Sequence, residues 1–299
     1  GAKFLLNTEN PKLIALNESN KEVALVTGHT DNQLIELENK KLNQIDVIFP
    51  LLHGTNGEDG TIQGLLKLSG IPFVGAGVLG SAVGMDKDVM KRLIRDAKLP
   101  IAKFMVVKIQ DVKELTFESV KKELGLPFFV KPANLGSSIG VNKVHAKEEF
   151  EIAINNAFLF DQKILIEEYI KCREIECAVL GNEEAQVSIP GEIIPTHEFY
   201  SYDAKYIDEN GAKIEIPAKL SKEQISEVQS LAMAAFKTLE CSGMGRVDCF
   251  LTDKGKFYIN EINTIPGFTN ISMFPKLWEA SGLTYKNLIA KLINLAIEK

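Results

Sequence analysis

Residues 245–273 constrain the fold of this chain more than any other stretch, because two strand-like runs flank a short turn there. The runs are residues 247–251 and 257–262, and Gly255 lies in the turn between them. Two apolar-rich runs joined by a short turn that contains glycine predict an antiparallel β-hairpin. The hairpin fixes which side chains share a face, and that decides what chemistry this segment can support.

One face of the expected hairpin carries polar and charged side chains. Because side chains alternate along a strand, Asp248, Glu261 and Asn263 are expected on one face, with Arg246 beside them. Asn260 is expected to point the other way. Two carboxylates and an amide oxygen are hard ligands suited to Mg²⁺ that is shared with substrate phosphates. The alternative is an ordinary exposed face of a surface hairpin, and this stretch alone does not decide between the two.

Composition narrows the class of protein. The chain has 299 residues and is 45% hydrophobic, which is enough for the cores of two or three domains. A net charge of −6 argues against nucleic acid as the main partner. No apolar run reaches about 18 residues, so no transmembrane helix is expected, and the first residues do not resemble a secretory signal. The four cysteines form no C-x-x-C pair, which favours reduced thiols in a cytoplasmic protein over a zinc site or disulfides.

A βαβ unit is expected before residue 75. It comprises a buried strand at 46–52, a glycine-rich loop at 55–61, a helix at 61–69 and a second strand at 71–74. Such a unit predicts a parallel sheet, and ligands of parallel sheets bind beyond the carboxyl ends of the strands. His53 and Glu58 fall at that position. For His53 the alternative is a capping or packing role.

Two helices are predicted from apolar spacing. The first covers residues 87–98, with four apolar side chains expected inward, namely Val89, Met90, Leu93 and Ile94. The second runs from the capping residue Ser221 to Leu239, and Gln224 completes a capping box.

A lysine followed by a glycine-rich loop occurs at residues 128–141. Lys131 closes a buried strand, and the loop Gly-Ser-Ser-Ile-Gly follows at 136–140. Small residues let backbone N–H groups approach phosphate oxygens, and the lysine supplies a point charge. The order is the reverse of a Walker loop. The alternative is a flexible hairpin.

Two further segments suit a nucleotide. A strand at 163–170 can present backbone groups to an adenine edge, and Glu174 follows where a ribose would lie. The alternative is a set of ordinary exposed acids. Residues 197–207 hold three tyrosines around Lys205, which indicates a lid. Partner contact is the alternative for this loop.

Six motifs in this order resemble the D-alanine–D-alanine ligases of the ATP-grasp superfamily. They are H-G-T-N-G-E-D-G-T at 53–61, M-D-K at 85–87, V-K-P-A-N-L-G-S-S-I-G-V at 130–141, Y-D-A-K-Y at 202–206, G-R-V-D at 245–248 and N-E-I-N-T-I-P-G-F-T at 260–269. The resemblance implies an α/β (α+β) protein with an ATP-grasp fold and an N-terminal parallel-sheet domain. The expected domains are 1–84 (substrate), 85–172 (central) and 173–299 (metal and substrate).

The resemblance also implies roles for individual residues. ATP would be bound by Lys87, Lys131, Ser138, Glu167, Ile170, Glu174 and Lys205. Two Mg²⁺ ions, replaceable by Mn²⁺, would be held by Asp248, Glu261 and Asn263. Arg246 and the Gly267 backbone N–H would stabilise an oxyanion, and Ser137 and Tyr206 would orient the first D-alanine. His53 would lie near the first D-alanine carboxyl, with Ser272 and Met273 at the second.

The implied reaction is the ATP-dependent joining of two D-alanines through an acyl phosphate, for peptidoglycan precursors, by a homodimer. Relatives that make D-alanyl-D-lactate carry a histidine where this chain has Tyr206, so the dipeptide is the expected product. Two other functions stay open. One is a different carboxylate–amine ligase of the superfamily, and the other is a non-catalytic nucleotide-binding protein.

One departure from the family pattern concerns residues 1–45. The family begins with a strand, a glycine-rich turn and a His-Glu-Val-Ser segment whose glutamate holds the substrate ammonium, and no such segment occurs here. The N-terminal domain is therefore expected to lack its first βαβ unit. The resulting hypothesis is that these 299 residues bind ATP but ligate slowly.

Overall fold

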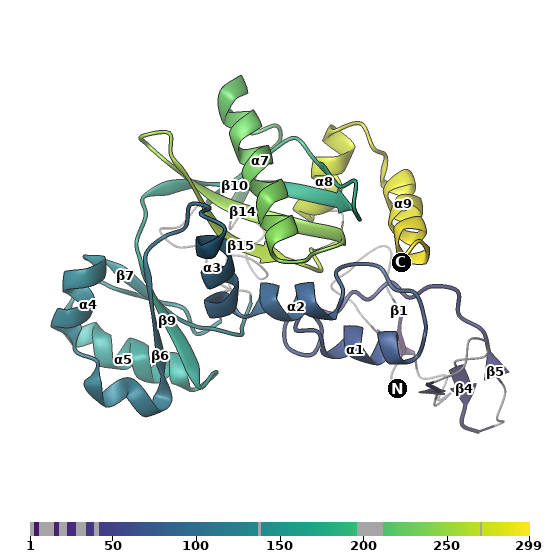
Figure 1. Cartoon of the computed structure of the whole chain (residues 1–299), viewed down its shortest axis with the longest axis horizontal. Helices are drawn as coiled ribbons and strands as arrows, with labels where there is room; N and C mark the ends of the chain where they lie inside the picture. Colours follow the sequence, from purple (N-terminus) through teal and green to yellow (C-terminus); the bar gives the residue numbers. More distant parts are fainter. Residues whose placement is uncertain are drawn as a thin grey trace.

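The computed structural model describes residues 3–5, 15–17, 23–27, 34–38, 42–136, 139–195, 212–269 and 271–299. Within them the chain forms two main antiparallel sheets with a group of helices between and around them (Figure 1). Two small antiparallel sheets lie in the N-terminal part. One pairs β1 (Lys3–Leu5) with β2 (Ala15–Asn17), and the other contains β3 (Val23–Leu25), β4 (Leu34–Glu36) and β5 (Leu42–Asn43).

The large sheet follows the order β13-β12-β10-β14-β15, and β11 pairs with β10 beside it. All of its pairs are antiparallel. The bounds are β10 (Cys172–Gly181), β11 (Gln186–Val187), β12 (Gly191–Pro195), β13 (Ala212–Glu215), β14 (Gly243–Thr252) and β15 (Phe257–Asn263). The expected C-terminal hairpin is therefore confirmed as β14–β15, and it contributes the last two strands of the sheet.

The β14–β15 ladder contains a bulge at the polar end of the hairpin. Asp248 pairs with Glu261, but Cys249 pairs with Ile259, which leaves Asn260 without a partner in the ladder. A bulge of this kind bends the strand and leaves one residue's backbone groups out of the ladder. Glu261 consequently lies opposite Asp248, on the same face as expected from the sequence.

Helices cover the two faces of the large sheet unequally. The helix α7 (Lys222–Thr238) packs on one face through buried residues such as Val228 and Phe236, which join Cys177 and Val247 in one core. The helices α8 (Met273–Ala280) and α9 (Tyr285–Ile297) cover only one end of the other face, around Ala178 and Met244. The uncovered remainder of that face carries the polar side chains.

Capping at the start of α7 follows the sequence prediction. Ser221 Oγ accepts from the Gln224 backbone N–H at 3.3 Å, while Gln224 Oε1 accepts from the Ser221 N–H at 3.0 Å. These reciprocal bonds satisfy backbone donors that the first helical turn would otherwise leave unpaired.

The central sheet follows the order β6-β9-β7-β8, again antiparallel. Its strands are β6 (Phe104–Lys108), β7 (Phe128–Pro132), β8 (Asn142–Val144) and β9 (Lys163–Glu168). The helices α4 (Phe117–Leu124) and α5 (Lys147–Phe158) cover one face, where the rings of Phe117, Phe128 and Phe150 lie 5.7–6.2 Å apart. A 3₁₀ helix (Ile109–Glu114) connects β6 to α4. The face opposite these aromatic rings carries Lys131 and Glu167.

Three helices connect the N-terminal part to the two main sheets. They are α1 (Thr61–Leu68), α2 (Val78–Met85) and α3 (Lys87–Asp96). In Figure 1, α3 lies between the central sheet and β15 of the large sheet. The Lys87 backbone N–H donates to the Ala133 carbonyl at 2.9 Å, which fixes the start of α3 against the segment after β7.

The expected strands at 46–52 and 71–74 are reduced to a single parallel bridge between Ile48 and Phe73. The parallel direction and the intervening helix are confirmed, but the strand length was wrong, and Leu51 and Leu52 are each 49% exposed. Among the described residues, Ile48 pairs with a neighbour on one side only, so nothing extends the ladder toward residue 52. The helix α2 was not predicted, because its apolar residues are not confined to one side.

The inward face of α3 differs from the prediction. Met90 and Ile94 are fully buried as expected, but Leu93 is 36% exposed and Lys91 is 0% exposed. Met90, Lys91 and Ile94 share one face because they follow the i, i+1, i+4 spacing of a helix. Apolarity alone predicts Leu93 inward, whereas buried charged partners draw Lys91 there instead.

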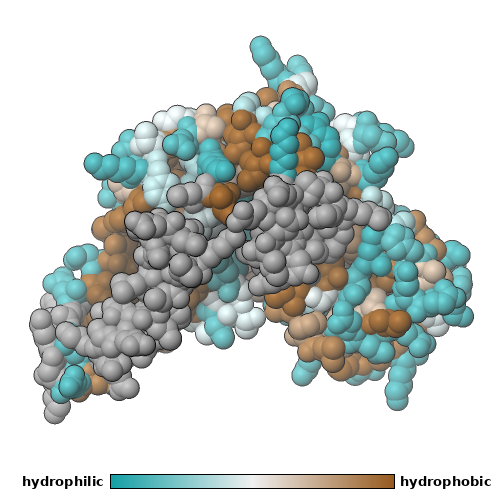
Figure 2. All heavy atoms as spheres, turned by 180° about the vertical axis from the view of Figure 1, so that it is seen from behind, coloured by the Kyte–Doolittle hydropathy of each residue, from teal (hydrophilic) through white to brown (hydrophobic). Residues whose placement is uncertain are grey.

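The surface of the described residues mixes hydrophilic and hydrophobic areas (Figure 2). No helix among these residues is long and apolar enough to cross a membrane.

We expect Asp86→Ala to lower the free energy of unfolding by about 2 kcal/mol or more. Asp86 Oδ1 caps α3 by accepting from the Asp88 and Val89 N–H groups, both at 3.1 Å, and its carboxylate accepts from Lys163 Nζ at 2.6 and 2.8 Å. Urea unfolding measures the loss. Thr116→Ala, which removes only the exposed cap of α4, is the matched control. An Asp86→Ala loss no larger than that of Thr116→Ala would contradict the expectation.

Candidate active site

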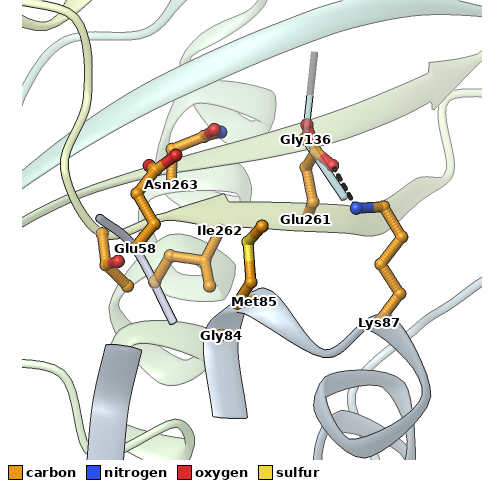
Figure 3. Close-up of a pocket in the computed structure, with 9 residues that line it drawn as sticks. Glu58, Gly84, Met85, Lys87, Gly136, Glu261, Ile262 and Asn263 are labelled. Atoms are coloured by element: carbon orange, nitrogen blue, oxygen red, sulfur yellow. Dashed lines mark ion pairs between the residues drawn. The ribbon is translucent and has the colours of Figure 1, made fainter. Parts of the chain in front are cut away.

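A pocket lies where the α2–α3 junction meets the polar face of β15 (Figure 3). Its lining residues come from segments far apart in the chain, and they are Glu58, Gly84, Met85, Lys87, Gly136, Glu261, Ile262, Asn263 and Thr264. Lys87 points toward Glu261, with Nζ 3.8 Å from Glu261 Oε2. The pocket thus joins the start of α3, the glycine-rich loop and the hairpin.

The three expected metal ligands lie together on the hairpin. Asp248 and Glu261 are cross-strand neighbours, and Asn263 Nδ2 donates to Asp248 Oδ2 at 2.9 Å. All three are partly buried. Glu261 and Asn263 line the pocket, and Asp248 lies next to them through its bond with Asn263. Oxygen donors of this kind suit Mg²⁺.

Arg246 lies between two carboxylates. Its Nε and Nη2 donate to Asp248 Oδ1 and Oδ2, both at 2.7 Å, and Nε lies 3.0 Å from Glu176 Oε2. Burial opposes the charge on Arg246, but Asp248 and Glu176 outweigh burial and hold the pKa of the guanidinium well above its ordinary value. Glu176 was not among the residues predicted from the sequence. It could have been found because it lies two residues after Glu174, on the same face of one strand.

The base of the glycine-rich loop is fixed by polar contacts. Lys87 Nζ donates to the Leu135 carbonyl at 2.6 Å, and Asp161 Oδ2 accepts from Asn134 N and Nδ2 at 2.8 and 2.9 Å. Gly140 has φ 69°, and a Cβ there would meet the Phe160 ring at 2.8 Å. Only glycine fits this position without strain.

The expected nucleotide residues lie along the face between the two sheets. Lys131 on β7 forms an ion pair with Glu167 Oε2 on β9. Burial raises the pKa of Glu167, but Lys131 and Lys91 outweigh it and hold the pKa below its ordinary value. Ile170 and Glu174 are partly exposed, and Glu174 lies on β10 on the same face as Glu176.

Gly267 and Ser272 lie side by side before α8. A Cβ on Gly267 would lie 2.8 Å from Ser272 Oγ, which itself accepts from the Thr269 N–H at 2.9 Å. Ser272 is the N-cap residue of α8, and the side chain of the following residue, Met273, is buried in the core. The backbone N–H groups at this helix start are suited to a carboxylate.

His53 is exposed and lies close to Glu58. Glu58 Oε2 accepts from the Gly54 N–H at 2.7 Å. Burial raises the pKa of Glu58, although the Gly54 bond and His53 oppose the shift. A partly buried acid therefore borders the pocket beside the histidine that the motif at 53–61 singled out.

Four expected site residues lie outside the described residues, namely Ser137, Ser138, Lys205 and Tyr206. Their roles stay predictions, as does the lid at 197–207.

Two protein-family models match this chain. Residues 3–76 match the model described as D-ala D-ala ligase N-terminus, and residues 93–294 match the one described as D-ala D-ala ligase C-terminus. The chain belongs to the D-alanine–D-alanine ligase family. The expected ATP-grasp fold is thereby confirmed, since the solved structures it resembles are ligases of this family.

Relatives match along nearly all of the chain. It is 56% identical over 297 residues to the D-alanine–D-alanine ligase of Oceanobacillus iheyensis, which covers 99% of this chain and 81% of the relative. It is 53% identical over 299 residues to D-alanine–D-alanine ligase A of Escherichia coli K12, covering 100% and 82%.

Two solved structures are also similar. A D-alanine–D-alanine ligase from Coxiella burnetii has a TM-score of 0.84 and 40% identity, covering 93% of this chain and 74% of that one. The VanG D-Ala:D-Ser ligase from Enterococcus faecalis has a TM-score of 0.84 and 38% identity, covering 92% and 79%.

We expect Arg246→Met to lower the free energy of unfolding by about 3 kcal/mol, because it leaves Asp248 and Glu176 facing each other without their shared cation. Adding Glu176→Gln should recover part of the loss, since one of the two uncompensated charges is then gone. Urea unfolding of both single variants and the double variant gives this coupling. Strictly additive losses would show that Arg246 and Glu176 do not interact in solution.

Proposed function

We propose that this chain joins two D-alanines to D-alanyl-D-alanine with ATP, releasing ADP and phosphate, as a step in peptidoglycan precursor synthesis. One observation carries the proposal. Glu261 and Asn263 of the hairpin line one pocket with Lys87 and with Gly136 of the glycine-rich loop, and Asp248 is bonded to Asn263, in a chain that matches ligases of this family over its whole length.

The nucleotide would lie between the two main sheets. Lys87 and Lys131 would contact its phosphates, with the loop at Ser138 over them and Lys205 reaching the γ-phosphate. Glu167, Ile170 and Glu174 would surround the nucleoside. The contacts of both lysines support this placement, because Lys87 bonds to the loop that borders the pocket and Lys131 is held by Glu167 on the adjacent central sheet.

Asp248, Glu261 and Asn263 would hold Mg²⁺, with two ions expected and Mn²⁺ as a substitute. The donor chemistry fits, since Glu261 and Asn263 line the pocket with oxygen atoms and the Asp248 carboxylate lies beside them. Among the described residues, no group of three or more His, Cys, Asp and Glu side chains forms a metal site by itself. A site completed by substrate phosphates agrees with that finding. Bound Mg²⁺ would neutralise charge on the phosphates during transfer.

The chemistry has two steps. A carboxylate oxygen of the first D-alanine attacks the γ-phosphorus, the bond to ADP breaks, and an acyl phosphate forms. The neutral amine of the second D-alanine then attacks the acyl carbonyl, and the tetrahedral intermediate expels phosphate as the peptide bond forms. Arg246 and the Gly267 N–H would stabilise the oxyanion of that intermediate.

Substrate placement follows from the same pocket. His53 would lie near the carboxyl of the first D-alanine, and Ser137 and Tyr206 would orient that substrate. The carboxylate of the second D-alanine would lie at the start of α8, at Ser272 and Met273. The free N–H groups of a helix start support an anion there.

Three finer points complete the proposal. Tyr206 favours an amine over D-lactate as second substrate. The co-substrate ATP and the four unpaired cysteines favour the cytoplasm.

Assembly as a homodimer is tested by sedimentation, and a single monomeric species would contradict it.

The deciding experiment measures phosphate release from ATP and Mg²⁺ with D-alanine, beside L-alanine, D-serine and D-lactate, with detection of the product. Release that requires D-alanine and yields the dipeptide supports the proposal. A preference for another amino acid would indicate a different carboxylate–amine ligase. ATP binding without release would indicate a non-catalytic nucleotide-binding protein, and slow release would bear out the hypothesis of impaired ligation.

We expect Asp248→Asn to lower kcat by about 100-fold, because it removes a carboxylate charge that would hold Mg²⁺ at the phosphates. Asp253→Asn is the matched control, since Asp253 is an exposed acid in the turn of the same hairpin. Steady-state phosphate release measures both. Equal activity of the two variants would remove Asp248 from the metal site.

A further inference from the structure

Lys91 is a fully buried lysine in the middle of α3. Its side chain is 0% exposed, and Nζ donates to Glu167 Oε1 at 2.7 Å and to the Asn260 carbonyl at 3.5 Å. Glu167 belongs to the central sheet and Asn260 to the large sheet. The ammonium therefore connects α3 to both sheets. The carbonyl it meets on β15 belongs to the bulge residue that the ladder leaves unpaired.

Glu167 lies between two lysines. Its Oε1 accepts from Lys91 and its Oε2 pairs with Lys131, while the residue itself is only 2% exposed. Lys131 is the member of this group nearest the solvent, with 13% of its side chain exposed. Two ammonium groups therefore share the Glu167 carboxylate, and Glu261 is a second negative charge that acts on Lys91.

Stability does not explain this arrangement. Removing an ammonium from water costs several kcal/mol, and buried ion pairs are often no more stabilising than apolar side chains of the same size. Burial lowers the pKa of Lys91, although the facing Glu167 opposes the shift. An apolar residue would fill the face between Met90 and Ile94 without that cost, so the lysine serves a purpose other than stability.

Lys91 itself cannot contact a ligand, because it has no exposed surface. Glu167 is also almost completely buried, whereas Lys131 reaches the face between the sheets. A lysine side chain has a flexible four-carbon stem, so an unrestrained Lys131 would sample many positions. Glu167 restrains it, and Lys91 in turn holds Glu167 and offsets its charge.

We propose that Lys91 is a positioning residue, which holds Glu167 so that the Lys131 ammonium is fixed at the nucleotide phosphates. This inference rests on the proposed function, since it assumes that the face between the sheets binds a nucleotide. Lys91 would therefore affect the affinity for phosphate groups although it touches no substrate.

The test compares ADP with adenosine, because only ADP carries phosphates. Lys91→Met keeps an unbranched side chain of similar length and removes the charge. We expect the Kd for ADP in the presence of Mg²⁺ to rise about tenfold, as for the loss of a charge-assisted contact. The Kd for adenosine should rise by no more than about threefold, because Glu167 also borders the nucleoside but its backbone stays fixed in β9. Titration calorimetry measures both. Lys237→Met, at an exposed position of α7, is the control and should leave both values unchanged.

A double-mutant cycle tests whether Lys91 acts through Glu167. In the Glu167→Gln background, adding Lys91→Met should change the Kd for ADP by less than about twofold. The double variant also removes both buried charges, so it keeps the test available if Lys91→Met alone folds poorly. Thermal unfolding and the fluorescence of the buried Trp278 report whether each variant is folded.

Three results would overturn the inference: unchanged ADP binding by folded Lys91→Met, an equal loss of ADP and adenosine binding, or a tenfold effect that persists without Glu167. The equal loss would indicate general damage to the cleft. If the unmodified chain fails to bind ADP, the proposed function falls and this inference with it. Normal ADP binding by both the unmodified chain and Lys91→Met overturns the inference alone.

Discussion

The structure depends on charge pairing at the junction of its two main sheets. Each sheet has one face covered by apolar helix packing, and the opposing faces carry charged side chains toward α3 and the hairpin. Those charges are tolerated because each is close to a charge of opposite sign, as Arg246 is to Asp248 and Glu176. Partnered charges keep the junction polar while it stays largely buried. A junction of this kind can receive a polyanion and its metal ions without rearranging the apolar cores.

Much of the fold was predictable because it depends on local patterns. The hairpin and the capped helix α7 follow from turn residues, capping residues and apolar spacing, which act over a few neighbouring residues. Alternation also predicts that Glu261 and Asn263 share a face, but their grouping with Asp248 depends on the bulge, which no local pattern predicted. The family resemblance then connected these local elements in order.

The remaining features depend on contacts between distant segments. Lys91 faces inward only because Glu167 and Asn260, far away in the chain, meet it there, so apolar spacing favoured Leu93 instead. Glu176 is important only through its cross-strand neighbours. The expected strand at 46–52 required pairing partners on both sides, and the described residues provide one. Local sequence patterns do not predict these positions, because an ion pair or a ladder hydrogen bond between distant segments decides each of them.

The bulge in β15 sets the phase of alternation along that strand. With strict alternation from Phe257, Glu261 would fall on the same side as Ile259, which packs in the core beneath α7. The bulge shifts the phase by one residue, so Ile259 stays in the core while Glu261 and Asn263 face the pocket. Asn260 is therefore the extra residue of the bulge and belongs to neither run of alternating side chains. The backbone carbonyl of this extra residue accepts the hydrogen bond from Lys91.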